Sequence, residues 1–223
     1  MTTRCLHPNS IPPTGLTPGT QYFYHIIPAN PNASLIPSPT PISTFKTPPA
    51  MGNPNQMTFD VVGDLGQTPD SQSTLDHMSA DWFNHSQFII HAGDMSYADC
   101  FGPRWDHYFD MIAPLASRMP WMVAAGNHEI EPNNLTGNIM DPYKARYAMP
   151  EVAPTQDTTQ YYQVPSQDGF DCTPSAFTGS YDFGNSFYSF KAGLVRLKSL
   201  ARCFCLSVCW LWRLPCFAQC IAL

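Results

Sequence analysis

The chain has 223 residues, of which 43% are hydrophobic and only 13% are charged, so it can bury a sizeable core. Its formal net charge of −6 argues against nucleic acid as a partner, because phosphate backbones require clustered lysine and arginine. No apolar stretch reaches the ~18 residues of a membrane span, and the first residues carry no apolar core of a secretory signal.

The first 50 residues contain no acidic residue and are rich in proline. Within them, "GLTPGTQYFYHIIPA" predicts a turn at Pro18-Gly19 followed by a strand, and "ISTFKTPP" predicts a second short strand. Two or three strands cannot bury a core of their own. We therefore expect residues 1–50 to be the last part of a β-sandwich whose earlier strands lie outside this chain.

Three apolar runs follow between residues 57 and 127, namely "MTFDVVGD", "SQFIIHAGD" and "PWMVAAGN". Helix-like segments separate them. In the first segment Thr68 is expected as the N-cap, with Pro69 as the first helical residue. The second, "RWDHYFDMIAPLASRM", is expected to break at Pro114. Alternating strands and helices predict βαβ units, and therefore an α/β fold with a parallel sheet.

Each apolar run ends in glycine followed by Asp64, Asp94 or Asn127, at intervals of 30 and 33 residues. A single Gly-Asp after a strand is more often a turn or a helix N-cap. Three in register are different, because the carboxyl ends of parallel strands line one crevice. Two carboxylates and an amide on one rim repel each other unless a cation such as Fe, Mn, Mg or Zn lies among them. The spacing therefore favours a metal site, in which one carboxylate could bridge two metals.

The motifs "GDLG" (63–66), "GDMSYAD" (93–99) and "GNHE" (126–129) resemble the first three metal motifs of the purple acid phosphatases. These enzymes are a branch of the calcineurin-like metallophosphoesterases. The segment "LTPGTQYFYHI" is similar to the end of the fibronectin-III-like domain that precedes the catalytic domain in the large members. The resemblance implies three parts: residues 1–50 from that domain, residues 55–195 as the N-terminal half of an incomplete metallophosphoesterase sheet sandwich, and a cysteine-rich tail, 196–223, with no domain assigned.

The resemblance also implies roles for individual residues. Asp64 would bind a ferric ion, Asp94 would bridge it to a divalent zinc, manganese or iron ion, and Asn127 would bind the divalent ion. Tyr97, one helical turn beyond Asp94, would place a phenolate on the ferric ion. His128 would contact the phosphate and help to protonate the leaving alkoxide. The implied reaction is hydrolysis of small phosphate monoesters at acidic pH.

Other residues have weaker interpretations. Glu129 is expected in a turn or next to the metal ligands, and His77, His85, His91 and His107 are expected to be structural or solvent-facing, with His91 packing below the site. Three Asn-x-Ser/Thr sequons make Asn32, Asn84 and Asn134 candidate glycosylation sites, which favours a secretory protein. The resemblance implies a secreted or vacuolar location and a homodimer.

The pattern also departs from the family. The resemblance implies further histidine ligands downstream, whereas no histidine follows His128. We therefore expect open metal sites, weak metal binding and a chain that is truncated at both ends. The tail holds five cysteines, which either replace the missing ligands or belong to sequence that was never selected to fold: Cys203, Cys205, Cys209, Cys216 and Cys220. Before the tail, "GSYDFGNSFYSFKAG" predicts a hairpin around Gly184-Asn185.

Two alternative functions remain open from the sequence. The first is a calcineurin-like phosphodiesterase or nucleotide pyrophosphatase, against which Tyr97 argues because its phenolate accompanies ferric chemistry. The second is a non-catalytic secreted fragment that acts through its sandwich remnant or as a binding module, which an absence of bound metal would favour.

Overall fold

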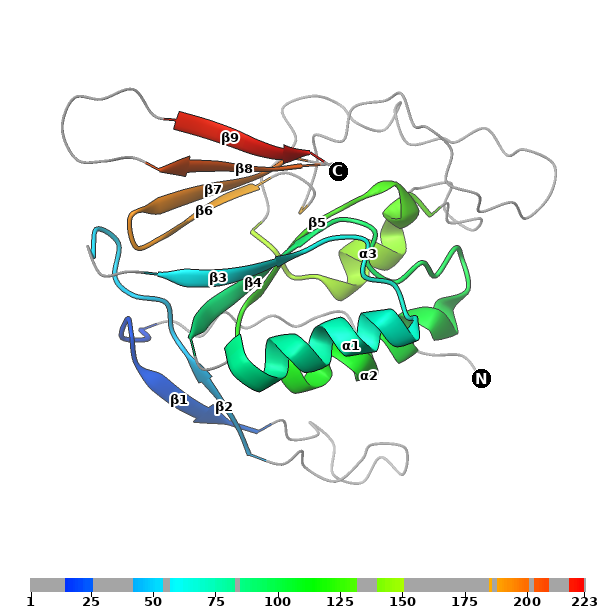
Figure 1. Ribbon diagram of the computed structural model, residues 1–223, viewed down its shortest axis with the longest axis horizontal. Helices are drawn as coiled ribbons and strands as arrows, with labels where there is room; N and C mark the ends of the chain where they lie inside the picture. Colours follow the sequence, from blue (N-terminus) through cyan, green and yellow to red (C-terminus); the bar gives the residue numbers. More distant parts are fainter. Residues whose placement is uncertain are drawn as a thin grey trace.

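A parallel three-stranded sheet forms the centre of the computed structural model, which describes residues 15–25, 42–53, 57–82, 85–131, 140–150, 185, 188–200, 203–208 and 217–222. Its strands are β3 (Thr58–Val62), β4 (Ser86–Ala92) and β5 (Trp121–Ala124), in the order β3-β4-β5 (Figure 1). Both pairings are parallel. The predicted βαβ arrangement is confirmed, and the three strands deliver their following loops to the same edge.

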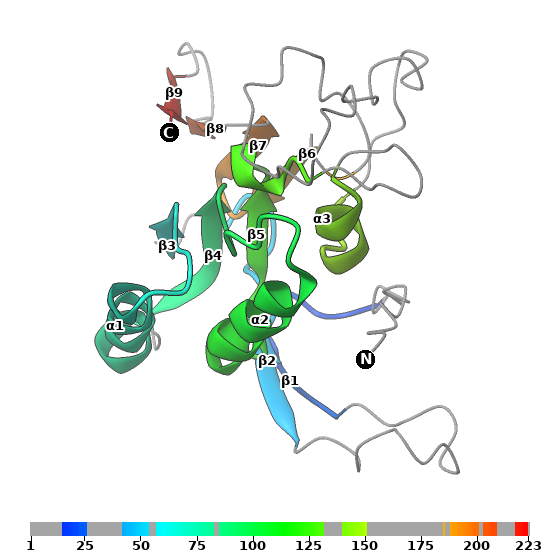
Figure 2. The ribbon, with the colours of Figure 1, turned by 90° about the vertical axis from the view of Figure 1, so that its right-hand side faces the viewer.

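Two helices cover one face of this sheet (Figure 2). Helix α1 (Pro69–His77) continues into a π-helical turn (Met78–Trp82), and α2 (Gly102–Ala116) lies beside it. The predicted N-cap is confirmed, because the Thr68 hydroxyl accepts a hydrogen bond from the backbone N–H of Ser71, 3.2 Å away.

The predicted break at Pro114 is wrong, because α2 runs through the proline and ends at Ala116. Pro114 lies in the last turn, so its missing N–H removes a hydrogen bond only where the helix is already ending. A third helix, α3 (Asp141–Arg146), follows beyond β5 and buries Tyr143.

The main core lies between the helices and the sheet. It contains aromatic and aliphatic side chains of α2 and of the inner strands that are at most 1% exposed, among them Trp105, Tyr108, Ile112, Ile89 and Val123. Their spacing along α2 places Trp105, Tyr108 and Ile112 on one side of the helix, which is the amphipathic pattern of a helix that covers a core.

A second, antiparallel sheet covers the other face. It comprises β6 (Tyr188–Ala192), β7 (Val195–Leu200), β8 (Cys203–Val208) and β9 (Phe217–Ala222) in sequential order. Phe88, Ile90 and Ala124 of the parallel sheet pack with Ala192 and Leu197 between the two sheets. The layers are therefore helices, parallel sheet and antiparallel sheet, which is the sheet sandwich expected from the sequence.

The cysteine-rich tail contributes two of these strands. β8 and β9 extend the sheet beyond β7, although the sequence suggested no structure there. The hairpin that the structure describes in this region turns at Gly193, between β6 and β7, and the turn predicted at Gly184-Asn185 falls partly outside the described residues.

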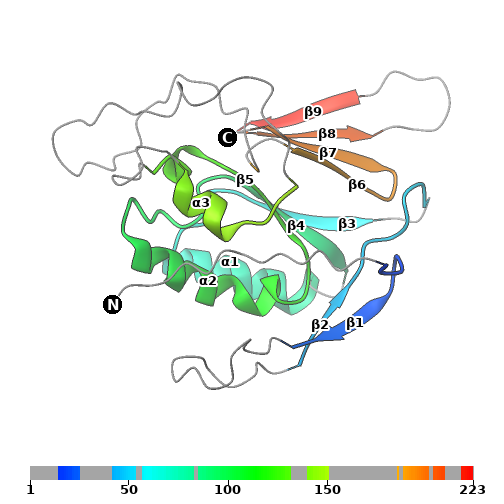
Figure 3. The same cartoon turned by 180° about the vertical axis from the view of Figure 1, so that it is seen from behind.

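The two predicted N-terminal strands are present as an antiparallel hairpin, β1 (Gln21–Tyr24) and β2 (Ser43–Lys46). The hairpin lies at the amino ends of the parallel strands, away from their carboxyl ends (Figure 3). There the Tyr24 hydroxyl donates to the carbonyl oxygen of Ser117 at 2.7 Å. The fibronectin-III-like origin of this hairpin stays a prediction.

His91 on β4 is completely buried beneath the sheet. Its Nδ1 accepts a hydrogen bond from Trp121 Nε1 (3.3 Å) and lies 2.9 Å from the Tyr108 hydroxyl. Burial without a charged partner lowers the pKa of His91 to about 3. The imidazole is therefore neutral in the folded protein, as expected of a structural histidine.

This burial predicts that acid destabilises the fold through His91. The unfolded chain takes up a proton below pH 6.5 and the folded chain does not until about pH 3, so the free energy of unfolding should fall by ~1.4 kcal/mol per pH unit between those values. Urea unfolding between pH 4 and 8 should show that His91→Gln has a shallower slope than the wild type. The control His77→Gln, which removes an exposed histidine, should keep the wild-type slope, and equal slopes for all three proteins would contradict this account.

Candidate metal centre

The predicted metal ligands lie where the parallel strands end. Asp64 and Asp94 each follow their strand by two residues, and Asn127 begins a 3-10 helix (Asn127–Glu129) directly beyond β5. Two backbone hydrogen bonds join the first two loops, from Asp64 N to the Gly93 carbonyl (3.1 Å) and from Gly66 N to the Met95 carbonyl (2.9 Å). The structure thus brings the three strand-end residues to one edge of the sheet.

Asp94 lies at the centre of this edge and is 8% exposed. Its Oδ1 accepts a hydrogen bond from the backbone N–H of His128 at 2.8 Å. Burial raises the pKa of Asp94, the contact with His128 opposes the shift, and the neighbouring charge of Asp64 raises it further. Two carboxyl groups therefore share this edge at an electrostatic cost that a cation would remove.

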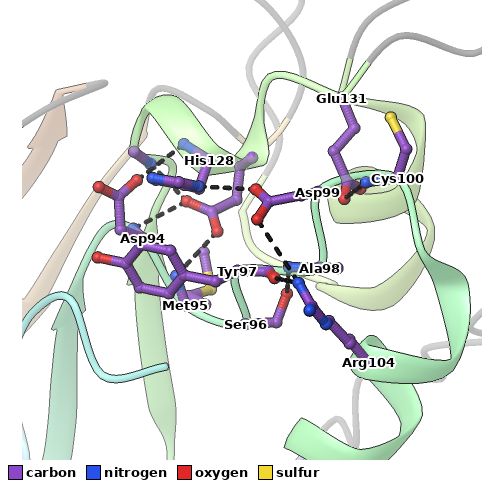
Figure 4. A network of polar contacts seen from close by, with 12 residues as sticks. Asp94, Met95, Ser96, Tyr97, Ala98, Asp99, Cys100, Arg104, His128 and Glu131 are labelled. Carbon is purple, nitrogen blue, oxygen red and sulfur yellow. Dashed lines mark hydrogen bonds and ion pairs between the residues drawn. The ribbon is translucent and has the colours of Figure 1, made fainter. Parts of the chain in front are cut away.

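Tyr97 lies against Asp64, in a local geometry that differs from the predicted one. Its hydroxyl donates to Asp64 Oδ1 at 3.1 Å, and its ring packs against the imidazole of His128 with centroids 4.1 Å apart and the ring planes tilted by 51° (Figure 4). The interpretation of Tyr97 as one helical turn beyond Asp94 is wrong, because residues 94–97 form a loop in which both have positive φ. Left-handed backbone at Asp94 and Tyr97 themselves sets their relative placement instead.

The phenol of Tyr97 is held protonated in the absence of a cation. Burial raises its pKa, and the charges of Asp64 and Asp94 raise it further, because a phenolate would face two carboxylates. A bound cation inverts this relation and favours the phenolate. The Tyr97 hydroxyl therefore acts as a donor to Asp64 until positive charge is present.

Backbone strain is concentrated in these loops. Asp64, Asp94, Tyr97 and Asp99 have φ between 47° and 50°, a region that non-glycine residues rarely occupy. Each such residue costs about 1–3 kcal/mol, and strain of this kind gathers at functional sites. Four of them around one rim indicate that the orientation of these side chains matters more than local stability.

Glu129 connects the ends of β4 and β5. Its buried carboxylate accepts three backbone hydrogen bonds, from Asp94 N (2.9 Å), Met95 N (2.8 Å) and Gly126 N (2.8 Å). Burial raises the pKa of Glu129 to about 7, and the three N–H donors oppose that shift. The sequence indicated only a turn residue or a neighbour of the ligands, whereas the structure shows that Glu129 braces two loops of the candidate site.

His128 has partners that the sequence did not predict. Its Nδ1 lies 2.8 Å from Asp99 Oδ1, and Asp99 Oδ2 lies 3.7 Å from the guanidinium of Arg104 (Figure 4). A carboxylate at Nδ1 fixes the tautomer and leaves Nε2 available for another contact. Asp99 closes the quoted motif "GDMSYAD", so the signal was present, but nothing in its spacing marked it as the partner of His128.

Glu131 is a second buried glutamate that accepts a hydrogen bond from the same loop. It accepts hydrogen bonds from the backbone N–H of Cys100 (2.8 Å) and from Trp105 Nε1 (3.0 Å), and it is 3% exposed. Two glutamates thus hold opposite ends of the loop between β4 and α2. Cys100 itself is disulfide-bonded.

The donor set fits a hard cation. Two carboxylates and a phenol lie together, with the half-buried Asn127 at the same edge, and oxygen donors of this kind suit iron, manganese or magnesium. Among the described residues, no three His, Cys, Asp or Glu side chains converge on one point. Asn32, Asn84, Asn134, Cys209 and Cys216 lie outside the described residues.

The chain is similar to known phosphoesterases. The family model "Calcineurin-like phosphoesterase" matches residues 57–204. Purple acid phosphatase 22 of Arabidopsis thaliana is 39% identical over 123 residues, and a nucleotide pyrophosphatase/phosphodiesterase of Hordeum vulgare is 27% identical over 172 residues. Among solved structures, a purple acid phosphatase from yellow lupin seeds superposes with a TM-score of 0.54 at 19% identity, covering 83% of this chain and 31% of that one.

The matches cover only part of the relatives. The alignments span 55% and 72% of this chain, but 27% and 45% of the Arabidopsis and Hordeum proteins respectively. The chain therefore corresponds to a minor part of each of these two relatives.

Gly126 is required by close packing against Asp94. A Cβ at this position would lie 2.2 Å from Asp94 Oδ1 and 2.5 Å from Asp94 N, both parts of the candidate site. Gly126→Ala should therefore displace Asp94, lower the free energy of unfolding by about 1–3 kcal/mol and weaken metal binding. Gly102→Ala is the matched control, since a Cβ there meets no atom within 4 Å. Thermal unfolding and metal titration test this prediction, which equal behaviour of the two variants would overturn.

Proposed function

The chain belongs to the calcineurin-like phosphoesterase family, and on that premise we propose that it is part of a metal-dependent acid phosphatase that hydrolyses small phosphate monoesters. The observation that carries the proposal is the gathering of Asp64, Asp94 and Tyr97 beside His128 at one sheet edge. Similarity to purple acid phosphatases supports the choice of reaction within the family.

The proposed metal ligands are Asp64 and Tyr97 for a ferric ion, Asn127 for a divalent zinc, manganese or iron ion, and Asp94 between the two. The two cations would supply Lewis-acid polarisation of the phosphate and activation of water at acidic pH. The strained backbone of Asp64, Asp94 and Tyr97 supports this assignment, because it aims three oxygen donors at one region at the expense of stability.

His128 is the proposed acid for the leaving group. The Asp99 carboxylate engages Nδ1 and the Tyr97 ring covers one face, so the imidazole has one orientation and Nε2 is the nitrogen that can meet the ester oxygen. Asp99 is in turn oriented by Arg104. In this scheme His128 holds a proton at Nε2 and transfers it to the departing alkoxide, while Asp99 acts as a positioning residue.

A secreted or vacuolar location fits the disulfide at Cys100, because disulfides persist in oxidising compartments. Glycosylation at Asn32, Asn84 and Asn134 and homodimer formation belong to the same proposal. None of the helices among the described residues is long and apolar enough to span a membrane.

A nucleotide pyrophosphatase or phosphodiesterase is the second candidate, favoured by the similarity to the Hordeum protein. The two activities differ in whether the phosphorus carries one ester substituent or two. Comparison of p-nitrophenyl phosphate with bis-p-nitrophenyl phosphate separates them, since a monoesterase should prefer the first compound.

The experiment for the proposed function is reconstitution of the purified chain with Fe(III) and zinc or manganese. Because open sites bind metal weakly, both ions are kept in excess, and elemental analysis under that condition should give about two metals per chain. The loaded protein should absorb visible light and hydrolyse p-nitrophenyl phosphate at acidic pH, and chelation should abolish both properties. A chain that retains no metal, shows no visible band and has no activity would contradict the proposal and favour the non-catalytic fragment.

Replacement of Tyr97 by phenylalanine tests the contribution of the phenolate oxygen to iron binding and to the visible band. Tyr97→Phe removes the oxygen that meets Asp64 but keeps the ring that packs against His128. The ferric form should lose its visible band and bind iron about tenfold more weakly or worse. Tyr22→Phe, in the N-terminal hairpin, should keep the band, and a band that survives Tyr97→Phe would assign the colour to another group.

A further inference from the structure

A cavity of ≈ 570 Å³ with both polar and apolar lining lies directly beside the candidate metal centre. Asp64 and Tyr97 form the wall that the cavity shares with the centre. The other lining residues include Gln67, Thr68, Arg104 and His107, none of which is assigned to metal binding or to proton transfer. The cavity therefore offers binding surface next to the reacting phosphate without being part of the metal site.

Two walls of the cavity are tied to each other. The Gln67 Oε1 lies 2.7 Å from His107 Nδ1, and its Nε2 donates to the carbonyl oxygen of Ser96 at 2.5 Å. The amide thus links the loop after β3 to the loop after β4 and to α2. A wall held at both ends offers a ligand fixed polar groups, which lowers the entropy lost on binding.

Arg104 supplies the positive charge of the cavity. Its Nη1 donates to the carbonyl oxygen of Tyr97 at 3.1 Å, and its ion pair with Asp99 is 3.7 Å long, so the guanidinium is held against the β4–α2 loop. The side chain is still 54% exposed. A guanidinium has five N–H donors in a planar fork that matches a carboxylate or a phosphate, and these two contacts leave donors available.

We propose that this cavity is a subsite for the leaving group of the substrate, and that it selects phosphate esters whose leaving group carries a second anionic group. The proposal rests on the proposed phosphatase function. The anionic group, a carboxylate or a second phosphate, is recognised by Arg104 with Gln67 and His107 as further polar contacts. Asp64 and Tyr97 belong both to the proposed metal centre and to the wall of this cavity, so a leaving group that reaches from the centre past Tyr97 meets the space that Arg104 borders.

Matched substrate pairs test the selectivity. 3-Phosphoglycerate and glycerol 3-phosphate differ by a carboxylate, and glucose 1,6-bisphosphate and glucose 6-phosphate differ by a phosphate. In the reconstituted protein the anionic member of at least one pair should have the higher kcat/KM, and Arg104→Gln should lower that preference about tenfold. The measured quantity is the ratio of the two kcat/KM values within a pair. A displacement of Asp99 that slows all substrates equally leaves this ratio unchanged. Which pair shows the effect identifies the anion.

Arg196→Gln is the matched control, because it removes an exposed arginine of β7 outside the cavity, and its preference should equal that of the wild type. Equal preference in Arg104→Gln and the wild type would overturn the subsite and leave the phosphatase assignment intact.

A binding measurement separates the subsite from the activity. D-Glycerate and inorganic phosphate, added to the metal-free chain, should shift the side-chain NMR signals of Arg104 and Gln67, and Arg104→Gln should weaken both titrations. A chain that hydrolyses nothing but shows these shifts would refute the proposed function and keep the anion site. Absence of shifts with either anion would refute the subsite.

Discussion

The carboxylate of Glu129 is the contact on which the geometry of the candidate centre depends. A buried carboxylate is costly unless donors surround it, and here the donors are the backbone N–H groups of Asp94, Met95 and Gly126. The requirement acts in both directions. The carboxyl oxygens keep the chain ends of β4 and β5 at one distance from each other, and those chain ends supply the donors that the buried carboxyl group needs.

Several other features follow from this brace. The two strand ends approach so closely that position 126 has no room for a Cβ, which explains the glycine of the third motif. The backbone of Asp94 adopts a left-handed conformation that it would otherwise avoid. Glu131 holds the far end of the same loop through Cys100 and Trp105, which places Asp99 against His128. The scaffold of helices and two sheets thus determines where the loops start, and two buried glutamates determine how they are shaped.

The sequence was informative where structure is local or periodic. The sequence predicted the strand ends at Asp64, Asp94 and Asn127 and the N-cap at Thr68, because apolar runs and capping patterns depend on neighbouring residues. The continuation of α2 through Pro114 and the loop conformation of Tyr97 could not, since packing and left-handed residues override the local preference. The partners of Glu129 and the pairing of Asp99 with His128 join residues about 30 positions apart, and spacing alone does not reveal such contacts.

The most direct test of this account is the metal affinity of Glu129→Gln, measured by titration calorimetry on the folded variant beside the wild type. The amide keeps the shape of the side chain but replaces one acceptor oxygen by an NH2 group, which turns donors toward backbone N–H groups. If the brace shapes the site, iron should bind about 10–100-fold more weakly, although Glu129 is no ligand itself. Equal affinities in the two proteins would contradict the account and would mean that the strand ends alone assemble the centre.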